Sequence, residues 1–225
     1  MKKIKFKTIH KTKIADTITP VGLYLRFRDV FANTLLLESS DYHSKEESFS
    51  FIAIDPLVTI KAENHHLSFY HKGVELKNQK IGKNFNSIFE SYSQSIDLAC
   101  PAELKSYNGL YGYTTYDAVQ YFENIALHVD ASPSEIPLMQ YSFYRFIIAI
   151  NHFNDEMTLI ENIEEGTASR IKEIQTIIDS QSFNTQKFEI TGEETSNCTN
   201  QDFKDYVVKA KSHCKRGDVF QLVLS

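Results

Sequence analysis

Residues 35–56 constrain the fold more than any other part of the chain. An apolar run at 35–37 is followed directly by Glu38, and a second apolar run ends in Asp55-Pro56. The ten residues between these runs, 39–48, are almost all polar or charged. Two short apolar runs separated by a polar loop predict two strands of one sheet.

Glu38 is the most informative residue of this stretch. A carboxylate at the end of a buried strand is costly unless it meets a cation or several hydrogen-bond donors. Ser39 adds a small hydroxyl, and together the two residues suggest a pocket for a ligand that carries an ammonium group. The competing interpretation is a strand end that emerges into solvent, which is the commoner case.

Composition excludes several classes of protein. The chain has 225 residues, 42% hydrophobic and 24% charged, which is typical of a soluble globular protein. The net charge of −5 and the lack of a basic stripe argue against nucleic-acid binding. No apolar run is long enough to span a membrane, and the basic start at 1–13 is interpreted as an ordinary N-terminus. Three widely spaced cysteines favour reduced thiols and a cytoplasmic location. The eight histidines lack metal-ligand spacing, so no metal site is predicted within this chain.

Periodicity predicts the remaining elements. The segment 21–30 fits a strand or a short helix. Amphipathic helices are expected at 84–98 and 166–180, and a third from Thr199 or Asn200 to Gly217, with a buried stripe (Phe203, Tyr206, Val207, Ala210, Cys214). Further strands are expected at 57–62, 67–71, 138–153, 157–163 and 218–225.

The segment 108–123 contains Gly109 and Gly112 in a short apolar strand. Two glycines in such a strand indicate close backbone approach or a bulge. A helix capped by Thr114 or Thr115 is expected to follow. A phosphate-binding loop is a weaker interpretation, because the glycine spacing matches neither nucleotide motif. These elements predict an α+β fold, with antiparallel sheets packed as a sandwich and helices outside.

Four segments of the chain resemble the N-terminal part of anthranilate synthase component I. Residues 36–39 are similar to the family's LLES motif, and 50–56 resemble its SFIG-x-DP stretch. Residues 108–123 are similar to its GGLVGYFGYD-x-V-x-x-FE stretch, and 217–225 to GD-[IV]-[FY]-Q-V-V-L-S. The resemblance implies a regulatory and partner-docking region at 1–180, a linker or surface crossing at 181–199, and a truncated start of the chorismate-binding catalytic domain at 200–225.

The resemblance also implies a regulatory site. In this family the LLES motif contacts free tryptophan, so Leu37, Glu38 and Ser39 are expected to bind the effector and to inhibit the distant chorismate site. The family often has Arg-Tyr where this chain has Ser48-Phe49. That departure leaves the ligand's carboxylate unassigned, with Lys45 as a substitute.

The implied activity is the conversion of chorismate and ammonia to anthranilate and pyruvate in tryptophan biosynthesis. The implied partner is a glutamine amidotransferase subunit that supplies ammonia. Gln221 lies where related enzymes that add water place a lysine, which fits the use of ammonia. The family's Mg²⁺ ligands and general acid are expected beyond position 225, so residues 1–225 alone are expected to be inactive.

Two alternatives remain open from the sequence. Aminodeoxychorismate synthase component I, from the folate branch, shares the fold and the GDVFQ-type segment. A non-catalytic effector-binding protein would keep only the regulatory half.

Overall fold

The computed structural model describes residues 3–39, 48–82, 84–123, 125, 136–180 and 187–224. The chain divides into two compact units, Met1–Asn184 and Thr185–Ser225. Among the described residues, the first unit holds the sheet and three α-helices, and the second holds one α-helix.

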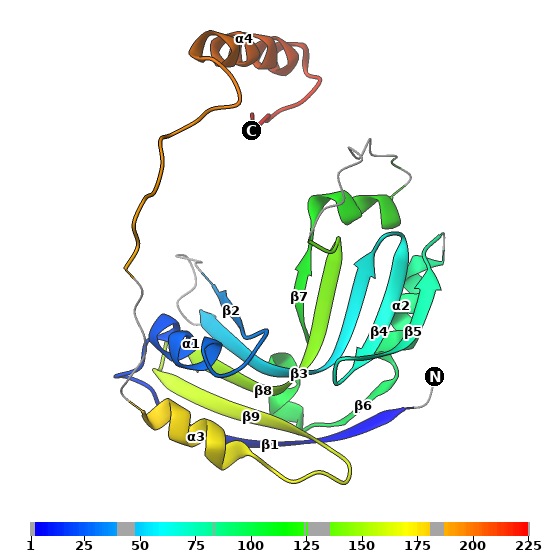
Figure 1. The fold of residues 1–225 in the computed structure, drawn as a ribbon, viewed down its shortest axis with the longest axis vertical. Coiled ribbons are helices and arrows are strands. Elements are labelled where there is room, and N and C mark those ends of the chain that lie inside the picture. Colours follow the sequence, from blue (N-terminus) through cyan, green and yellow to red (C-terminus); the bar gives the residue numbers. More distant parts are fainter. Residues whose placement is uncertain are drawn as a thin grey trace. The chain divides into compact units, whose positions relative to one another are not determined.

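The described strands of the first unit form one nine-stranded sheet (Figure 1). The strand order is β5-β4-β3-β8-β9-β1-β6, with β2 paired to β3 and β7 paired to β8. The strands are β1 (Ile4–Ile14), β2 (Leu35–Glu38), β3 (Phe49–Glu63), β4 (His66–His71), β5 (Val74–Lys80), β6 (Ile96–Ala99), β7 (Leu110–Thr114), β8 (Met139–Asn151) and β9 (Glu156–Glu164). The predicted α+β class with flanking helices is confirmed. The expected separate antiparallel sheets are joined into one, and the β1–β6 pair is parallel.

The long strands β3 and β8 join the two halves of this sheet. The first part of β3 pairs with β2 and its second part with β4, while β8 runs beside both parts. Asp55 has φ 62°, and the β3–β8 register shifts between Pro56 and Val58. The strand break predicted at Asp55-Pro56 is therefore wrong. The site is a bend within one strand, at a residue type that tolerates the left-handed conformation.

Three helices cover the sheet (Figure 1). The first, α1 (Pro20–Arg28), settles the open choice at 21–30; Thr19 Oγ1 accepts a hydrogen bond from the Gly22 N–H (3.1 Å) at its start. It shares an apolar core with α3 (Ile171–Asp179) and one face of β3, β8 and β9. Helix α2 (Phe85–Ser93) packs on β4, where the Phe69 and Tyr92 rings lie 5.3 Å apart.

Two predicted helices are shorter than expected. The helix expected at 84–98 ends at Ser93, because Ser95 turns the chain by bonding back to the Tyr92 carbonyl. Residues 96–99 then form β6, parallel to β1. The helix expected at 166–180 begins only at Ile171. Ser169 and the Arg170 N–H instead bond the Glu161 carboxylate, which holds the preceding segment out of the helix.

The N-terminal segment is a full strand of the sheet. The interpretation of 1–13 as an ordinary N-terminus missed β1, which lies between β9 and β6. Phe6 and Thr8 are buried, whereas Lys5 and Lys7 are exposed. That alternation is the strand signal.

Gly112 confirms the expected close backbone approach. A Cβ built on it would contact the Gln140 carbonyl oxygen and lie 2.7 Å from Tyr141 Cα in β8. The helix expected after Thr115 is a short 3₁₀ helix, η3 (Tyr116–Tyr121). A second 3₁₀ helix, η2 (Ala102–Tyr107), precedes β7.

The second unit contains α4 (Asn200–Arg216). The predicted capping box is present: Asp202 N–H donates to Thr199 Oγ1 (3.2 Å), and Thr199 N–H donates to Asp202 Oδ2 (3.0 Å). Gly217 ends the helix with φ 79°. The predicted buried stripe is wrong, because α4 has no buried residue and Phe203 and Tyr206 are 49% and 51% exposed. Residues 218–224 are not a strand, which corrects the expectation for 218–225.

Candidate functional site at the end of β2

The three predicted effector residues meet at the end of β2. Leu37 and Glu38 are the last two residues of the strand, and Ser39 follows; all three are exposed. Ser39 N–H donates to the Phe49 carbonyl (3.0 Å), so the ladder continues past the strand end. Because side chains alternate along a strand, Glu38 and Ser39 leave the backbone toward opposite faces of the sheet.

Glu38 faces a buried hydroxyl across the strand pair. Its partner in the register is Ser50. The neighbouring pair, Ser39 and Phe49, carries the backbone hydrogen bond, so Glu38 and Ser50 form a non-hydrogen-bonded pair, in which side chains lie closer together. Ser50 is only 1% exposed.

His152 completes a polar row over three strands. Ser50 Oγ lies 2.8 Å from His152 Nε2, and the His152 N–H donates to the Ser48 carbonyl (3.0 Å). His152 directly follows β8 and is exposed. A carboxylate, a hydroxyl and an imidazole therefore gather at one end of β2, β3 and β8. Sequence reasoning did not select Ser50 or His152, because only the strand register brings residues 102 positions apart together.

The opposite face of the same strand ends is aromatic. Leu37 pairs with Phe51 in the register. The rings of Phe49 and Phe51 stack at 5.9 Å, and Phe49 lies 5.4 Å from the Tyr107 ring. The end of β2 thus separates a polar row from an aromatic cluster.

Lys45, proposed as a substitute cation, lies outside the described residues, which resume at Ser48. Ser48 and Phe49 themselves offer no positive side chain to this site.

Gln221 belongs to the second unit. It is exposed and lies in an irregular segment after α4. Nearby, Asp218 Oδ2 accepts a hydrogen bond from Arg216 Nη2 (2.6 Å) and lies 2.8 Å from His213 Nδ1. The Arg216 hydrogen bond, followed by that of His213, lowers the pKa of Asp218. His213, Arg216 and Asp218 bond one another, whereas Gln221 is exposed and forms no hydrogen bond with another described residue.

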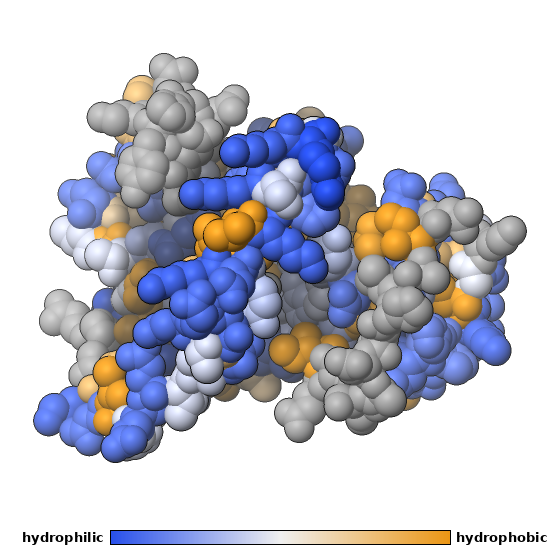
Figure 2. Space-filling view, turned by 90° about the horizontal axis from the view of Figure 1, so that it is seen from above, coloured by the Kyte–Doolittle hydropathy of each residue, from blue (hydrophilic) through white to orange (hydrophobic). Residues whose placement is uncertain are grey.

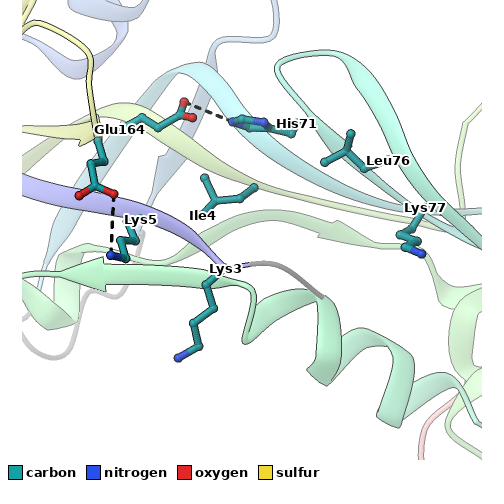
Figure 3. Close-up of a pocket in the computed structure, with 8 residues that line it drawn as sticks. Lys3, Ile4, Lys5, His71, Leu76, Lys77 and Glu164 are labelled. Carbon is teal, nitrogen blue, oxygen red and sulfur yellow. Dashed lines mark hydrogen bonds and ion pairs between the residues drawn. The ribbon is translucent and has the colours of Figure 1, made fainter.

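A separate cavity of about 640 Å³ lies between the starts of β1 and β5 and the ends of β4 and β9. Of its three lysines, Lys5 pairs with Glu165 (3.8 Å), and Lys3 and Lys77 do not point toward one another (Figure 3). Its acidic residue Glu164 is already engaged by Lys72 Nζ (2.6 Å) and His71 Nε2 (3.3 Å). This cavity contains none of the predicted site residues and lacks converging free charges.

Figure 2 shows a largely hydrophilic face on which hydrophobic residues gather in separate small patches. Within the described ranges, no helix is long and apolar enough to cross a membrane. Among the same residues, no group of three His, Cys, Asp or Glu side chains could hold a metal ion.

The chain belongs to the chorismate binding enzyme family, whose profile matches residues 34–225. Anthranilate synthase component 1 of Lactococcus lactis is 25% identical to it over 222 residues, and that of Acetivibrio thermocellus is 27% identical over 232 residues. Each alignment covers 94% of this chain and 46% of the relative. The chain thus spans about half the length of these relatives.

The fold agrees with this assignment. The crystal structure of anthranilate synthase component I from Streptococcus pneumoniae superimposes with a TM-score of 0.51 and 19% identity, covering 92% of this chain and 46% of that one. At this identity the likeness establishes the fold alone.

Proposed function

We propose that this chain is the amino-terminal part of an anthranilate synthase component I, which makes anthranilate and pyruvate from chorismate and ammonia in tryptophan biosynthesis. The relatives that cover nearly the whole chain carry that name. In this proposal residues 1–180 are the regulatory and partner-docking region, and residues 200–225 begin the chorismate-binding domain. The full-length enzyme takes ammonia from a glutamine amidotransferase subunit, and its location is cytoplasmic.

The regulatory part of the proposal places L-tryptophan at Leu37, Glu38 and Ser39. The observation that carries it is the carboxylate of Glu38. It is exposed at the end of β2, and among the described residues no cation forms an ion pair with it. A carboxylate without a partner can form a charge-assisted hydrogen bond with an α-ammonium group. Binding there would inhibit the chorismate site through a coupling free energy between the two sites.

Two further parts concern the chemistry of the full-length enzyme. Gln221 is proposed to select ammonia over water, because an amide cannot act as the base that activates water. Mg²⁺ is proposed as the cofactor that binds the carboxylates of chorismate. Its ligands are expected beyond residue 225.

Calorimetric titration with L-tryptophan tests the regulatory site. The wild-type chain is expected to bind, and Glu38→Gln is expected to weaken binding by about tenfold, because a charged hydrogen bond is removed. Ser39→Ala removes a hydroxyl on the opposite face of the strand and shows whether the ligand reaches around the strand end. Glu165→Gln, at an exposed carboxylate directly after β9, is the matched control and should bind like wild type. Equal affinity for all four proteins would contradict the site assignment.

A fluorescence assay tests the catalytic part. Residues 1–225 with chorismate, Mg²⁺ and ammonium are expected to produce no anthranilate, whereas the same chain extended through the second half of the relatives' length should produce it. Anthranilate emission from the 225-residue chain would overturn the division of functions.

A further inference from the structure

The effector site described so far holds one end of its ligand. An α-amino acid carries an ammonium and a carboxylate, and Glu38 supplies the partner for the ammonium. Ser48 and Phe49 offer no cation for the carboxylate. A buried or half-buried carboxylate without a donor costs binding free energy, so a second polar group is needed.

His152 is the exposed nitrogen donor that the register brings to this place. It pairs with Ser48 through its backbone N–H, and its ring lies beside Ser50, the residue opposite Glu38. Glu38, Ser50 and His152 all lie on one face, because the register places Ser50 opposite both Glu38 and Ile150, and His152 is two residues past Ile150.

The Ser50 hydroxyl fixes the ring of His152. It lies 2.8 Å from Nε2 and is itself buried. When the hydroxyl donates to Nε2, the proton of the neutral imidazole lies on Nδ1. Nδ1 has no hydrogen-bond partner among the described residues, so it can donate to a ligand.

The separation fits a small zwitterion. Two interstrand steps of about 4.8 Å each lie between β2 and β8. His152 is also displaced by two residues along the strands from the position opposite Ser50, so the Glu38 and His152 backbones lie roughly 12 Å apart. That separation can hold two side chains and the two charged groups of one amino acid between them.

We propose that His152 binds the carboxylate of the amino-acid effector whose ammonium Glu38 holds, with Ser50 as the positioning residue of the imidazole. This inference rests on the proposed tryptophan site. The site would then bind both charged groups of an α-amino acid with residues from three neighbouring strands.

Titrations with L-tryptophan, tryptamine and indole-3-propionate separate the two roles. Tryptamine lacks the carboxylate, and indole-3-propionate lacks the ammonium. His152→Ala is expected to weaken L-tryptophan about tenfold and to leave tryptamine unchanged. Glu38→Gln should weaken L-tryptophan and tryptamine and leave indole-3-propionate unchanged. His10→Ala, an exposed histidine of β1, is the matched control and should change none of the three.

Ser50 variants test the positioning role. Ser50→Ala is expected to weaken L-tryptophan severalfold without changing tryptamine, and Ser50→Thr, which keeps the hydroxyl, should restore part of the loss. A thermal melt of each variant shows whether the fold is retained.

The outcomes distinguish this inference from the proposed function. If L-tryptophan binding depends on Glu38 but His152→Ala changes L-tryptophan and tryptamine equally, His152 is not the carboxylate partner and this inference fails alone. If the wild-type chain binds no L-tryptophan, the tryptophan site fails, and the role of His152 fails with it.

Discussion

The guanidinium of Arg145 lies 3.1 Å from the carboxylate of Glu161, which is completely buried. The same carboxylate accepts hydrogen bonds from Ser169 Oγ (2.6 Å) and the Arg170 N–H (2.8 Å), and Arg145 Nη2 donates to the Ala168 carbonyl (2.6 Å). One buried charge therefore joins β8, β9 and the segment that leads into α3.

Removing the cation should destabilise the first unit strongly. Arg145→Met leaves the Glu161 charge buried and uncompensated, which should lower the free energy of unfolding by about 3–5 kcal/mol. Urea denaturation followed by circular dichroism measures the change. Arg28→Met is the control, because Arg28 forms an exposed pair with Asp29 (3.4 Å) and should cost at most about 1 kcal/mol. Similar losses of unfolding free energy in the two variants would show that the buried pair stabilises the fold no more than the exposed pair.

A methyl group at Gly112 should disrupt the β7–β8 contact. Gly112→Ala places a Cβ against the Gln140 carbonyl and 2.7 Å from Tyr141 Cα, and such overpacking should cost about 2–3 kcal/mol. Gly109 directly precedes β7, and a Cβ there meets open space, so Gly109→Ala should change the free energy of unfolding by less than about 0.5 kcal/mol. Thermal melts compare the two. The close approach would be disproved if both variants melted like wild type.

Glu164 should make stability depend on pH. Burial raises its pKa, but the Lys72 hydrogen bond and the nearby charges of His71 and Lys72 outweigh burial, so the pKa in the folded protein lies below its usual value. A lowered carboxyl pKa gives stability that is present above the unfolded-state pKa of about 4.3 and is lost as the pH falls through the lower folded-state value.

Glu164→Gln should therefore be less stable than wild type at pH 7 by about 0.5–1 kcal/mol, and the difference should disappear as the pH falls below about 4. Glu165→Gln is the control, since its nearest described cation, Lys5 Nζ, is 3.8 Å away and both side chains are exposed. Urea titrations at pH 7, 5 and 3.5 measure the differences. A gap between Glu164→Gln and wild type that stayed constant over this range would exclude the carboxylate as its source.

The capping box of α4 should control the order of the helix's first turn. Thr199→Ala removes the acceptor of the Asp202 N–H and should cost about 1 kcal/mol locally. Faster amide hydrogen exchange at residues 201–203 would report this loss. Ser212→Ala changes a hydroxyl that bonds the Lys209 carbonyl late in the same helix and should leave those amides unchanged.

Local signals in the sequence were sufficient for several elements. The Thr199–Asp202 pair and Gly217 predicted both ends of α4, and the long apolar run at 138–153 predicted the central strand β8. Other elements depended on long-range pairing. Ile96 continues the helical spacing of Ile88 and Tyr92 and fits a strand equally well, and only the pairing with β1 decides for β6.

The candidate site was predictable in part for the same reason. Glu38 stood out because a carboxylate followed an apolar run, a pattern visible within a few residues. Ser50 looked like an ordinary strand residue, and His152 an ordinary turn residue. Their contact depends on the register between β3 and β8, which no local window contains.

The pairing of β1 with β9 has a consequence for how the protein is made. Ile4–Ile14 leave the ribosome long before their antiparallel partner, Glu156–Glu164. About 150 residues must be synthesised before the loop between the two strands can close, and contacts of such separation slow folding. Until β9 is made, the growing chain therefore carries an unpaired β9-facing edge on β1, which is the kind of edge that chaperones protect.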